Sequence, residues 1–171
     1  MRTYGFLYVL MCFFVVGFLV PDGAISSSSK SDPLKIKMSG YVVVVEKVKG
    51  KSVERLAPLG KNVDPGALVQ YEITAVNDSS GVLNNISVVG EIPPSMNYVE
   101  KSAKSSKKSE ALFSADNGDT FSEKPLRTVV SESGSLKKVL ASPNEYTNLK
   151  FISSKIKPKK KIVYTYRAVV K

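Results

Sequence analysis

Lysine side chains form three dense groups after residue 100, and ammonium groups spaced this closely attract anionic polymers. The groups are Lys101, Lys104, Lys107 and Lys108, then Lys137 and Lys138, and then Lys155, Lys157 and Lys159 to Lys161. Clustered positive charge draws phosphate or sulfate polymers by long-range attraction, and lipopolysaccharide, wall polymers and nucleic acid are all of this class. The candidate contact residues are Lys104, Lys107, Lys108, Lys157, Lys159, Lys160 and Lys161.

A soluble, lysine-rich surface is the alternative interpretation of the same residues. Lysine far outnumbers arginine in these groups, and no aromatic residue alternates with it to stack against bases. Lysine on edge strands also discourages edge-to-edge aggregation. We therefore expect no specific nucleic-acid partner, and the sequence favours the alternative over a dedicated polyanion site.

The composition argues against most kinds of catalysis. The chain has no His and one Cys, Cys12, which lies inside an apolar N-terminal run. The usual nucleophile and base pairs, and the usual zinc, copper and haem ligands, need one of these residue types. The carboxylates are scattered over turns and strand faces. The sequence predicts a protein that is not an enzyme, with no catalytic, cofactor-binding or metal-binding residues and no cofactor.

One acidic cluster, Asp116-Asn117-Gly118-Asp119, has oxygen ligands close enough together to suggest calcium. Its spacing does not match an EF-hand loop, whose ligands are spread over 12 residues. Asn-Gly is a strong hairpin-turn signal and explains the cluster fully. We expect a turn there, and no metal.

The first 26 residues have the layout of a secretory signal peptide. A basic start with Arg2 precedes an uncharged run of 15 residues, Phe6 to Val20. As a helix this run would reach about 22 Å, short of a hydrocarbon core of about 30 Å. Ala24 and Ser26 fit a cleavage site after Ser26, and an uncleaved membrane anchor is the alternative. We expect an exported protein, in the periplasm, at the cell surface or outside the cell.

The remaining residues predict a Ser-rich tether, 27–33, and one all-β domain, 34–171. Removing the signal peptide removes one basic and one acidic residue, so the domain keeps the net charge of +10. Short runs of alternating apolar residues are separated by Gly, Pro, Asn and Ser clusters, a pattern typical of an antiparallel sandwich. The expected strands are 40–48, 67–76, 86–92, 96–99, 148–152 and 162–170, and we expect the last two to pair.

Within this pattern two sets of residues are expected to point into the core. One consists of Val69, Tyr71, Ile73 and Ala75, and the other of Ile162, Tyr164, Tyr166 and Ala168. Residues 42–45 are apolar on both faces, which predicts a strand covered twice or one with a partner. Residues 100–110 are expected to form an exposed, mobile loop or an edge segment, and residues 122–142 give no clear pattern.

The order of these motifs resembles the domain-of-unknown-function-eleven family over roughly residues 42–170. The matching features are Asp64-Pro65-Gly66 before the strand with Tyr71, then Asn77 with Gly81, Ile92-Pro93 with Tyr98, the 114–121 hairpin, and Ile156-Lys157-Pro158 before Tyr164. The resemblance implies a bacterial, immunoglobulin-like β-sandwich of the cell envelope without established enzymatic activity. Gly90 departs from the family, which usually has Asp two residues before the Ile-Pro pair.

Two functions follow as hypotheses. The first is a non-catalytic exported envelope or surface protein, acting as a structural or protein-interaction module. Its partner would be an envelope protein or a second copy, joined through a sheet edge such as the 42–45 strand. The second is a polyanion-binding module that uses the lysine groups. Contact with a membrane is expected only through the N-terminal segment, if that segment is not cleaved.

Overall fold

The computed structural model describes residues 32–171. The predicted signal peptide, 1–26, and residues 27–31 of the tether lie outside the described residues. Residues 32–171 form an all-β, sandwich-like unit of antiparallel sheets, which confirms the predicted all-β class. No helix in this part of the chain is long and apolar enough to span a membrane.

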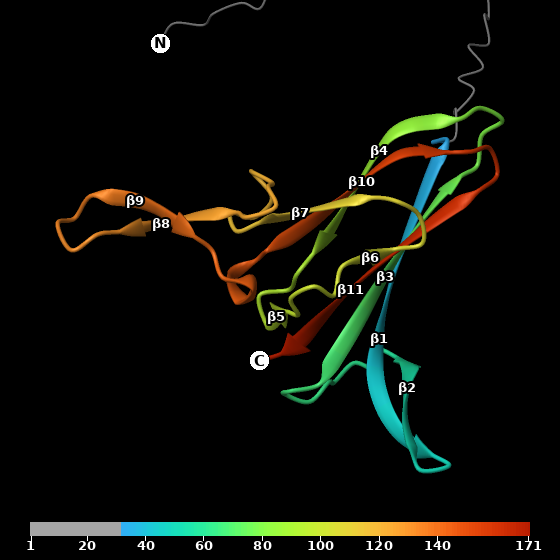
Figure 1. Cartoon of the computed structure of the whole chain (residues 1–171), viewed down its shortest axis with the longest axis horizontal. Helices are drawn as coiled ribbons and strands as arrows, with labels where there is room; N and C mark the ends of the chain where they lie inside the picture. Colours follow the sequence, from blue (N-terminus) through green and yellow to red (C-terminus); the bar gives the residue numbers. More distant parts are fainter. Residues whose placement is uncertain (1–31) are drawn as a thin grey trace, which may run out of the picture. The chain divides into compact units, whose positions relative to one another are not determined.

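Two main sheets and one hairpin make up the unit (Figure 1). The larger sheet has the order β2-β1-β3-β11-β5, with β6 also paired to β11, and the smaller sheet has the order β4-β10-β7. Strands β8 and β9 form a separate hairpin that projects from the two main sheets. The strands are β1 (Leu34–Val48), β2 (Lys51–Pro58), β3 (Leu68–Asn77), β4 (Leu83–Glu91), β5 (Met96–Tyr98), β6 (Lys104–Ser105), β7 (Glu110–Ser114), β8 (Leu126–Val130), β9 (Leu136–Leu140), β10 (Asn148–Ile156) and β11 (Lys161–Val170), and a short 3-10 helix, η1 (Pro143–Glu145), precedes β10.

The core lies between the two main sheets and is built from alternate residues of β3, β4, β10 and β11. Both sets of residues expected to point inward are buried, which confirms the alternation in 67–76 and 162–170. Aromatic rings stack in this core: Phe151 of the smaller sheet on Tyr164 of the larger one, with centroids 4.8 Å apart, and Tyr71 on Tyr166, its partner in the neighbouring strand of the larger sheet, at 5.1 Å. Such pairs add stabilisation beyond the buried area itself.

The buried tyrosine hydroxyls have hydrogen-bond partners, as burial requires. Tyr166 donates to the Glu91 carbonyl oxygen at 2.5 Å, and the Tyr164 and Ser153 hydroxyls lie 2.7 Å apart. Burial raises the pKa of both tyrosines above the ordinary value, so both stay neutral. The inner layer is therefore aromatic and uncharged.

Cross-sheet contacts show which strands lie over which. Phe113 of β7 packs on Tyr98 of β5, and Phe151 of β10 packs on Tyr164 of β11. Gly90 of β4 lies against Ile73 of β3 and Tyr166 of β11. The smaller sheet therefore covers β5, β11 and β3 in turn, and it has no strand left to cover β1.

The predicted pairing of 148–152 with 162–170 is wrong. β10 pairs with β4 and β7, whereas β11 pairs with β3, β5 and β6. Both strands carry large side chains on alternate positions, and these side chains meet face to face across the core. The chain therefore changes sheets at residues 157–160 instead of folding back as a hairpin.

Other expectations need smaller corrections. β1 begins at Leu34, six residues before the predicted start, and β2 lies in a segment for which no strand is predicted. Residues 100–110 contain β6, and residues 122–142 contain the β8–β9 hairpin. The turn at 116–119 is confirmed, since Asn117 and Gly118 both have positive φ and the backbones of Phe113 and Ser122 exchange two hydrogen bonds.

Residues 42–45 are not covered on both faces, contrary to one of the two expectations. Val43 is buried, but Val45 on the same face of the strand is 63% exposed, and Val44 on the other face is 39% exposed. Beyond Val42 the strand pairs with β2 only, so its other side is a free edge. This part of β1 belongs to a hairpin that extends past β3 (Figure 1).

Gly90 provides a test of the packing between the sheets. A Cβ at this position would lie 2.9 Å from Cε1 of Tyr166 and 3.1 Å from Cδ1 of Ile73. Gly90→Ala should therefore lower the free energy of unfolding by about 1–3 kcal/mol, because overpacking displaces the rings. Urea denaturation followed by tyrosine fluorescence measures this change.

Gly81→Ala is the matched control, because a Cβ at Gly81 would have no atom within 4 Å. The control reports the effect of an added methyl group on the unfolded chain alone. Equal stability of the two variants would contradict the close contact described here.

Candidate functional site

Six lysines gather around one cavity at the end of the sandwich where β10 passes into β11. The cavity has a volume of about 430 Å³. Lys107 and Lys108 come from the β6–β7 loop, and the other four come from the end of β10, the turn and the start of β11. We call this feature the basic cavity; its lining residues are Lys107, Lys108, Ser154, Lys155, Ile156, Lys157, Lys160, Lys161 and Ile162.

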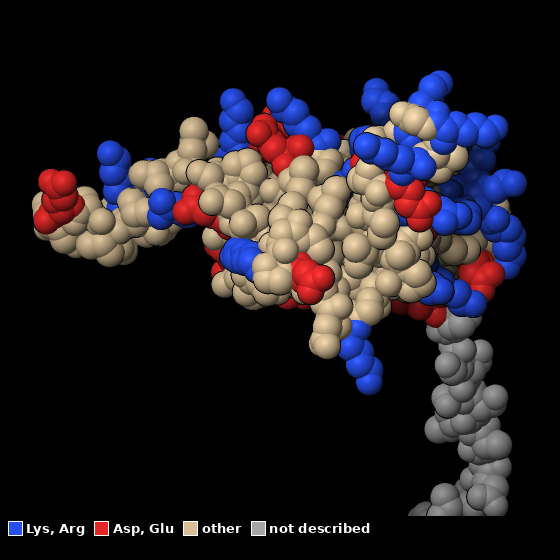
Figure 2. Space-filling view, turned by 90° about the horizontal axis from the view of Figure 1, so that it is seen from below, with Lys and Arg blue, Asp and Glu red and all other residues tan. Residues whose placement is uncertain are grey.

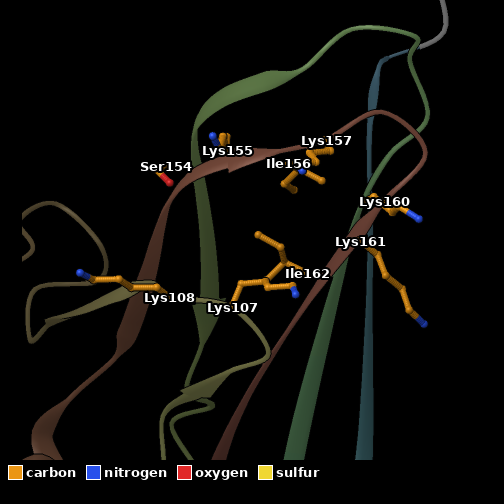
Figure 3. A pocket seen from close by; sticks show the side chains of 9 residues that line it. All are labelled: Lys107, Lys108, Ser154, Lys155, Ile156, Lys157, Lys160, Lys161 and Ile162. Atoms are coloured by element: carbon orange, nitrogen blue, oxygen red, sulfur yellow. The ribbon is translucent and has the colours of Figure 1, made fainter.

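The basic cavity has charged sides and an apolar floor (Figure 3). Figure 3 shows Ile156 and Ile162 lying between the two loop lysines and the four lysines of β10 and β11. The two isoleucines are 2% and 3% exposed, so they belong to the core, whereas all six lysines are exposed. The core therefore holds the backbone, while the ammonium groups stay in water.

Hydrogen bonds between hydroxyls attach the β6–β7 loop to the core. The Ser153 hydroxyl, which pairs with Tyr164, is also 2.7 Å from the Ser109 hydroxyl. Ser109 in turn lies 3.1 Å from the Ser105 hydroxyl and donates to the Lys107 carbonyl oxygen. This chain of hydroxyls leads from a buried tyrosine to the backbone of a cavity lysine.

Backbone contacts complete the attachment of the loop. The Ser106 amide donates to the Val163 carbonyl oxygen at 2.8 Å, and the Val163 amide donates to the Ser106 hydroxyl at 2.9 Å. The loop is thus bound to β11 directly before Lys107. Of the two expectations for residues 100–110, the structure has the edge segment, which holds two of the cavity lysines in place.

Asn77 fixes the other side of the cavity. Its side chain is fully buried and donates to the carbonyl oxygens of Gly81 and Ile156, at 2.7 and 2.9 Å. Its backbone amide donates to the Lys160 carbonyl oxygen at 2.9 Å. One asparagine therefore joins the loop after β3 to both ends of the 157–160 turn.

Among the described residues, no acidic side chain lines the basic cavity, although Glu110 lines a neighbouring hollow with Lys108 and Ser154. Among residues 32–171, none of its six lysines forms an ion pair. On the face seen from below in Figure 2, which is not the side of the basic cavity, Lys and Arg also gather at the end away from the β8–β9 hairpin, with several acidic side chains among them. Like charges this close repel one another, and an anion bound between them would relieve the repulsion.

Two of the seven candidate contact residues lie outside the basic cavity. Lys159 has φ of 55° and donates from Nζ to the carbonyl oxygen and Oδ1 of Asp78, at 2.6 and 3.0 Å. Hydrogen bonds from Lys35 and Lys159 lower the pKa of Asp78 to about 2. Lys104 is on β6 beside Thr165 and lines a different hollow with Gln70 and Arg167.

The structure brings together the other five candidates: Lys107, Lys108, Lys157, Lys160 and Lys161. Lys155 also lines the basic cavity, although it is not among the candidate contacts. Because Lys155 belongs to the third lysine group of the sequence, that grouping could have identified it as a candidate. Lys137 and Lys138 lie on β9, in the separate hairpin. Sequence proximity alone does not separate cavity lysines from the others.

The Asp116 turn is closed by its own side chains. The Ser114 hydroxyl and the Thr120 amide both donate to Oδ1 of Asp116, and the Thr120 hydroxyl donates to Oδ2. These bonds lower the pKa of Asp116 to about 2. In the described part of the chain, no three His, Cys, Asp or Glu side chains gather as a metal site would need.

The chemistry that the basic cavity offers is attraction of an anion by several ammonium groups. Lysine is a mobile point charge and suits phosphate, sulfate or carboxylate groups without demanding one geometry. No aromatic side chain lines the cavity, so it offers no surface on which a base could stack.

The hydroxyl chain can be tested by removing its first link. Ser153→Ala would leave the buried Tyr164 hydroxyl without a partner, so the free energy of unfolding should fall by about 1–3 kcal/mol. Adding Tyr164→Phe removes the unpaired hydroxyl, so the double variant should be less destabilised than the sum of the single variants. Chemical denaturation of all four proteins measures this coupling, and additive losses would contradict it.

No family model, curated protein or solved structure matches this chain. The likeness to the domain-of-unknown-function-eleven family therefore stays a prediction from the sequence, and the basic cavity is the feature from which function can be argued.

Proposed function

We propose that this protein is an exported, non-catalytic binding module whose basic cavity holds a polyanion. The observation that carries the proposal is the convergence of six lysines from two distant segments around one cavity whose described lining contains no acidic residue. A surface that served solubility alone would not require two loops to be fixed together by buried hydroxyl and amide groups.

The ligand class follows from the lining. Several ammonium groups on exposed side chains fit a flexible polymer with repeated phosphate or sulfate groups, such as lipopolysaccharide or a wall polymer. Base recognition would need aromatic or bidentate partners, and the cavity lining contains neither. Binding should therefore follow charge density and salt concentration more than polymer sequence.

The test uses heparin and inorganic polyphosphate as probes. The variant Lys157→Gln/Lys160→Gln/Lys161→Gln removes three cavity charges, and its affinity at low salt should fall about tenfold. The affinity of the unchanged protein should decrease steeply with salt, since bound counterions are released on binding. Isothermal titration calorimetry at several salt concentrations measures both effects.

The matched control is Lys47→Gln/Lys49→Gln/Lys51→Gln, which removes three exposed lysines near the β1–β2 turn and changes the net charge equally. This control should keep most of the affinity. An equal loss in both variants would mean diffuse surface attraction, and no binding at low salt would refute the proposal.

Protein interaction within the cell envelope is the second candidate function. It is supported by the β8–β9 hairpin, where Leu126 pairs with Leu140 and Val130 with Leu136 on one exposed face. A hairpin of two strands is only marginally stable in water without further packing. Its exposed face is a surface that an envelope partner or a second copy could cover.

For the fold, we propose an immunoglobulin-like sandwich of the kind that the domain-of-unknown-function-eleven family implies. Two facing antiparallel sheets, with the chain passing between them after β3 and β10, support this description. Gly90 replaces the family's Asp, and the Tyr166 ring lies where a side chain would project.

The export proposal rests on the N-terminal sequence and has a direct test. We expect the protein isolated from its own cell to begin at or within two residues of Ser27, and to be found outside the cytoplasm. N-terminal sequencing and intact mass after cell fractionation measure this. A chain that keeps Met1 and sediments with membranes would instead be the anchored form.

A further inference from the structure

A second cavity lies at the opposite end of the sandwich from the basic cavity. It has a volume of about 530 Å³, within the range of about 300–1,000 Å³ that is typical of pockets for small ligands. β10 runs from this cavity, at Asn148, to the basic cavity, at Lys155, and β11 runs back from Lys161 to the second cavity, which Lys171 also lines (Figure 1). We call it the polar cavity, and it shares no lining residue with the basic cavity.

Hydrogen bonds fix the segments that surround the polar cavity. The Ile92 amide donates to the Thr147 carbonyl oxygen at 2.8 Å, and the Asn117 amide donates to the Thr147 hydroxyl at 3.0 Å. The Lys171 amide donates to the Ser95 carbonyl oxygen at 2.9 Å. Thr147 thus joins the β4–β5 loop and the turn after β7 to the start of β10. Walls fixed in this way are preorganised, so a ligand loses little affinity to ordering them.

Three carboxamides from three different segments line the polar cavity. Asn117 lies in the turn after β7, Asn144 in η1, and Asn148 at the start of β10. Among residues 32–171, none of these three side chains forms a hydrogen bond. Each carboxamide therefore offers a ligand two donor hydrogens and an acceptor oxygen.

Glu91 and Asn148 are direct neighbours on two strands. They are paired in the register of β4 and β10, so both side chains project from the same face of the smaller sheet. Side chains paired in this way have Cβ atoms about 4.5–5.5 Å apart. The Glu91 carboxylate forms no ion pair within the described residues, and only its backbone oxygen accepts a hydrogen bond. A group that only accepts thus lies beside a group that also donates, a combination that matches two adjacent hydroxyls.

The charges around the polar cavity nearly cancel. Glu145 is neutralised by an ion pair with Arg127 at 2.7 Å. The lining then has one carboxylate, that of Glu91, and one ammonium group, that of Lys171, which donates to the Pro94 carbonyl oxygen. In the described part of the chain, no three His, Cys, Asp or Glu side chains gather to hold a metal ion. The lining therefore favours a neutral ligand over a polyanion or a cation.

The β4–β5 side of the polar cavity is apolar. Pro93, Pro94 and Met96 line it, and the proline rings bring no amide hydrogen. A sugar ring has hydroxyls around its edge and C–H groups on its faces, so it matches carboxamides on one side and prolines on the other. A peptide carries one backbone donor and one acceptor per residue, whereas every sugar hydroxyl can both donate and accept. Closely spaced carboxamides therefore suit a sugar better than a peptide.

From these observations we propose that the polar cavity binds a neutral sugar unit. Glu91 and Asn148 bind two adjacent hydroxyls, Asn117 and Asn144 bind further hydroxyls, and the two prolines contact a C–H face of the ring. The sugar site does not depend on the proposed function of the basic cavity, because the two cavities lie at opposite ends of β10.

The probes are cellobiose, mannobiose and N,N′-diacetylchitobiose, which are neutral disaccharides with different substituents. We expect at least one to bind the full chain with a Kd of about 1 mM or lower. It should shift the NMR signals of the side-chain amides of Asn117, Asn144 and Asn148. The affinity should be the same at about 1 M salt, because a neutral ligand has no charge to screen. Absence of binding by all three probes, or affinity that falls steeply with salt, would overturn the proposal.

Two variants test the neighbouring pair. Asn148→Ala and Glu91→Ala each remove one hydroxyl partner, so we expect about tenfold weaker binding of the same disaccharide in each. Since neither side chain has a hydrogen bond within residues 32–171, both variants should unfold at nearly the temperature of the unchanged protein. Asn84→Ala is the matched control, at an exposed position of β4 outside the polar cavity, and should bind normally. Unchanged binding in both test variants, or an equal loss in the control, would contradict the proposed site.

Two further outcomes also count against it. Disaccharide binding that is lost in the triple Gln variant of Lys157, Lys160 and Lys161 but kept in Asn148→Ala would assign the sugar to the basic cavity. N-acetyl-tetra-alanine amide is the neutral peptide probe and should leave the asparagine signals unchanged. Tighter binding of this peptide than of any disaccharide, with shifts at the same asparagines, would make the polar cavity a peptide site.

Discussion

The hydrogen bond between the hydroxyls of Tyr164 and Ser153 is the contact on which the rest of this structure depends. It joins β11 of the larger sheet to β10 of the smaller one, next to the stack of Phe151 on Tyr164. A buried hydroxyl without a partner costs more than a paired one contributes, so this contact restricts the two strands to one relative position. The chain must then cross between sheets within the few residues from Lys157 to Lys160.

The lysines are arranged by that same crossing. Ser109 extends the hydrogen bond outward and holds the β6–β7 loop, while Asn77 binds the carbonyl oxygens of Ile156 and Lys160 on the opposite side. Neutral buried groups thus bring two positively charged segments together, although their charges repel. Local conflict of this kind is expected at functional sites, where the rest of the structure must compensate for it. The compensation here is the uncharged core beneath the basic cavity.

Strand positions and burial could be predicted from the sequence, whereas strand partners could not. Alternating residues such as Val69, Tyr71 and Ile73 identify the buried face because side chains in a strand alternate between faces. The same alternation in 148–152 and 162–170 does not say whether two faces lie side by side or opposite each other, and the prediction chose wrongly. β2 has almost no buried residue, so its sequence shows no alternation of apolar and polar residues from which a strand could be predicted. Lys159 was grouped with its neighbours in sequence, but its positive φ turns it to Asp78.

The edge of β4 is open, since β4 pairs with β10 alone among the described residues, and there must be a physical reason why copies do not stack through it. Lys and Pro on edge strands are common protections, and β2 has Lys51, Arg55 and Pro58. β4 has instead Asn85, whose φ of 53° interrupts its extended backbone, and the overhang of β1, whose core face extends one strand beyond the smaller sheet. This overhang stands in the way of another sandwich, which is two layers thick. Protection is needed here because Ile36 and Met38 of β1 are 53% and 44% exposed, and exposed apolar side chains beside a free edge promote aggregation. The interrupted backbone at Asn85 and the overhang of β1 together explain why the sandwich can leave this edge open.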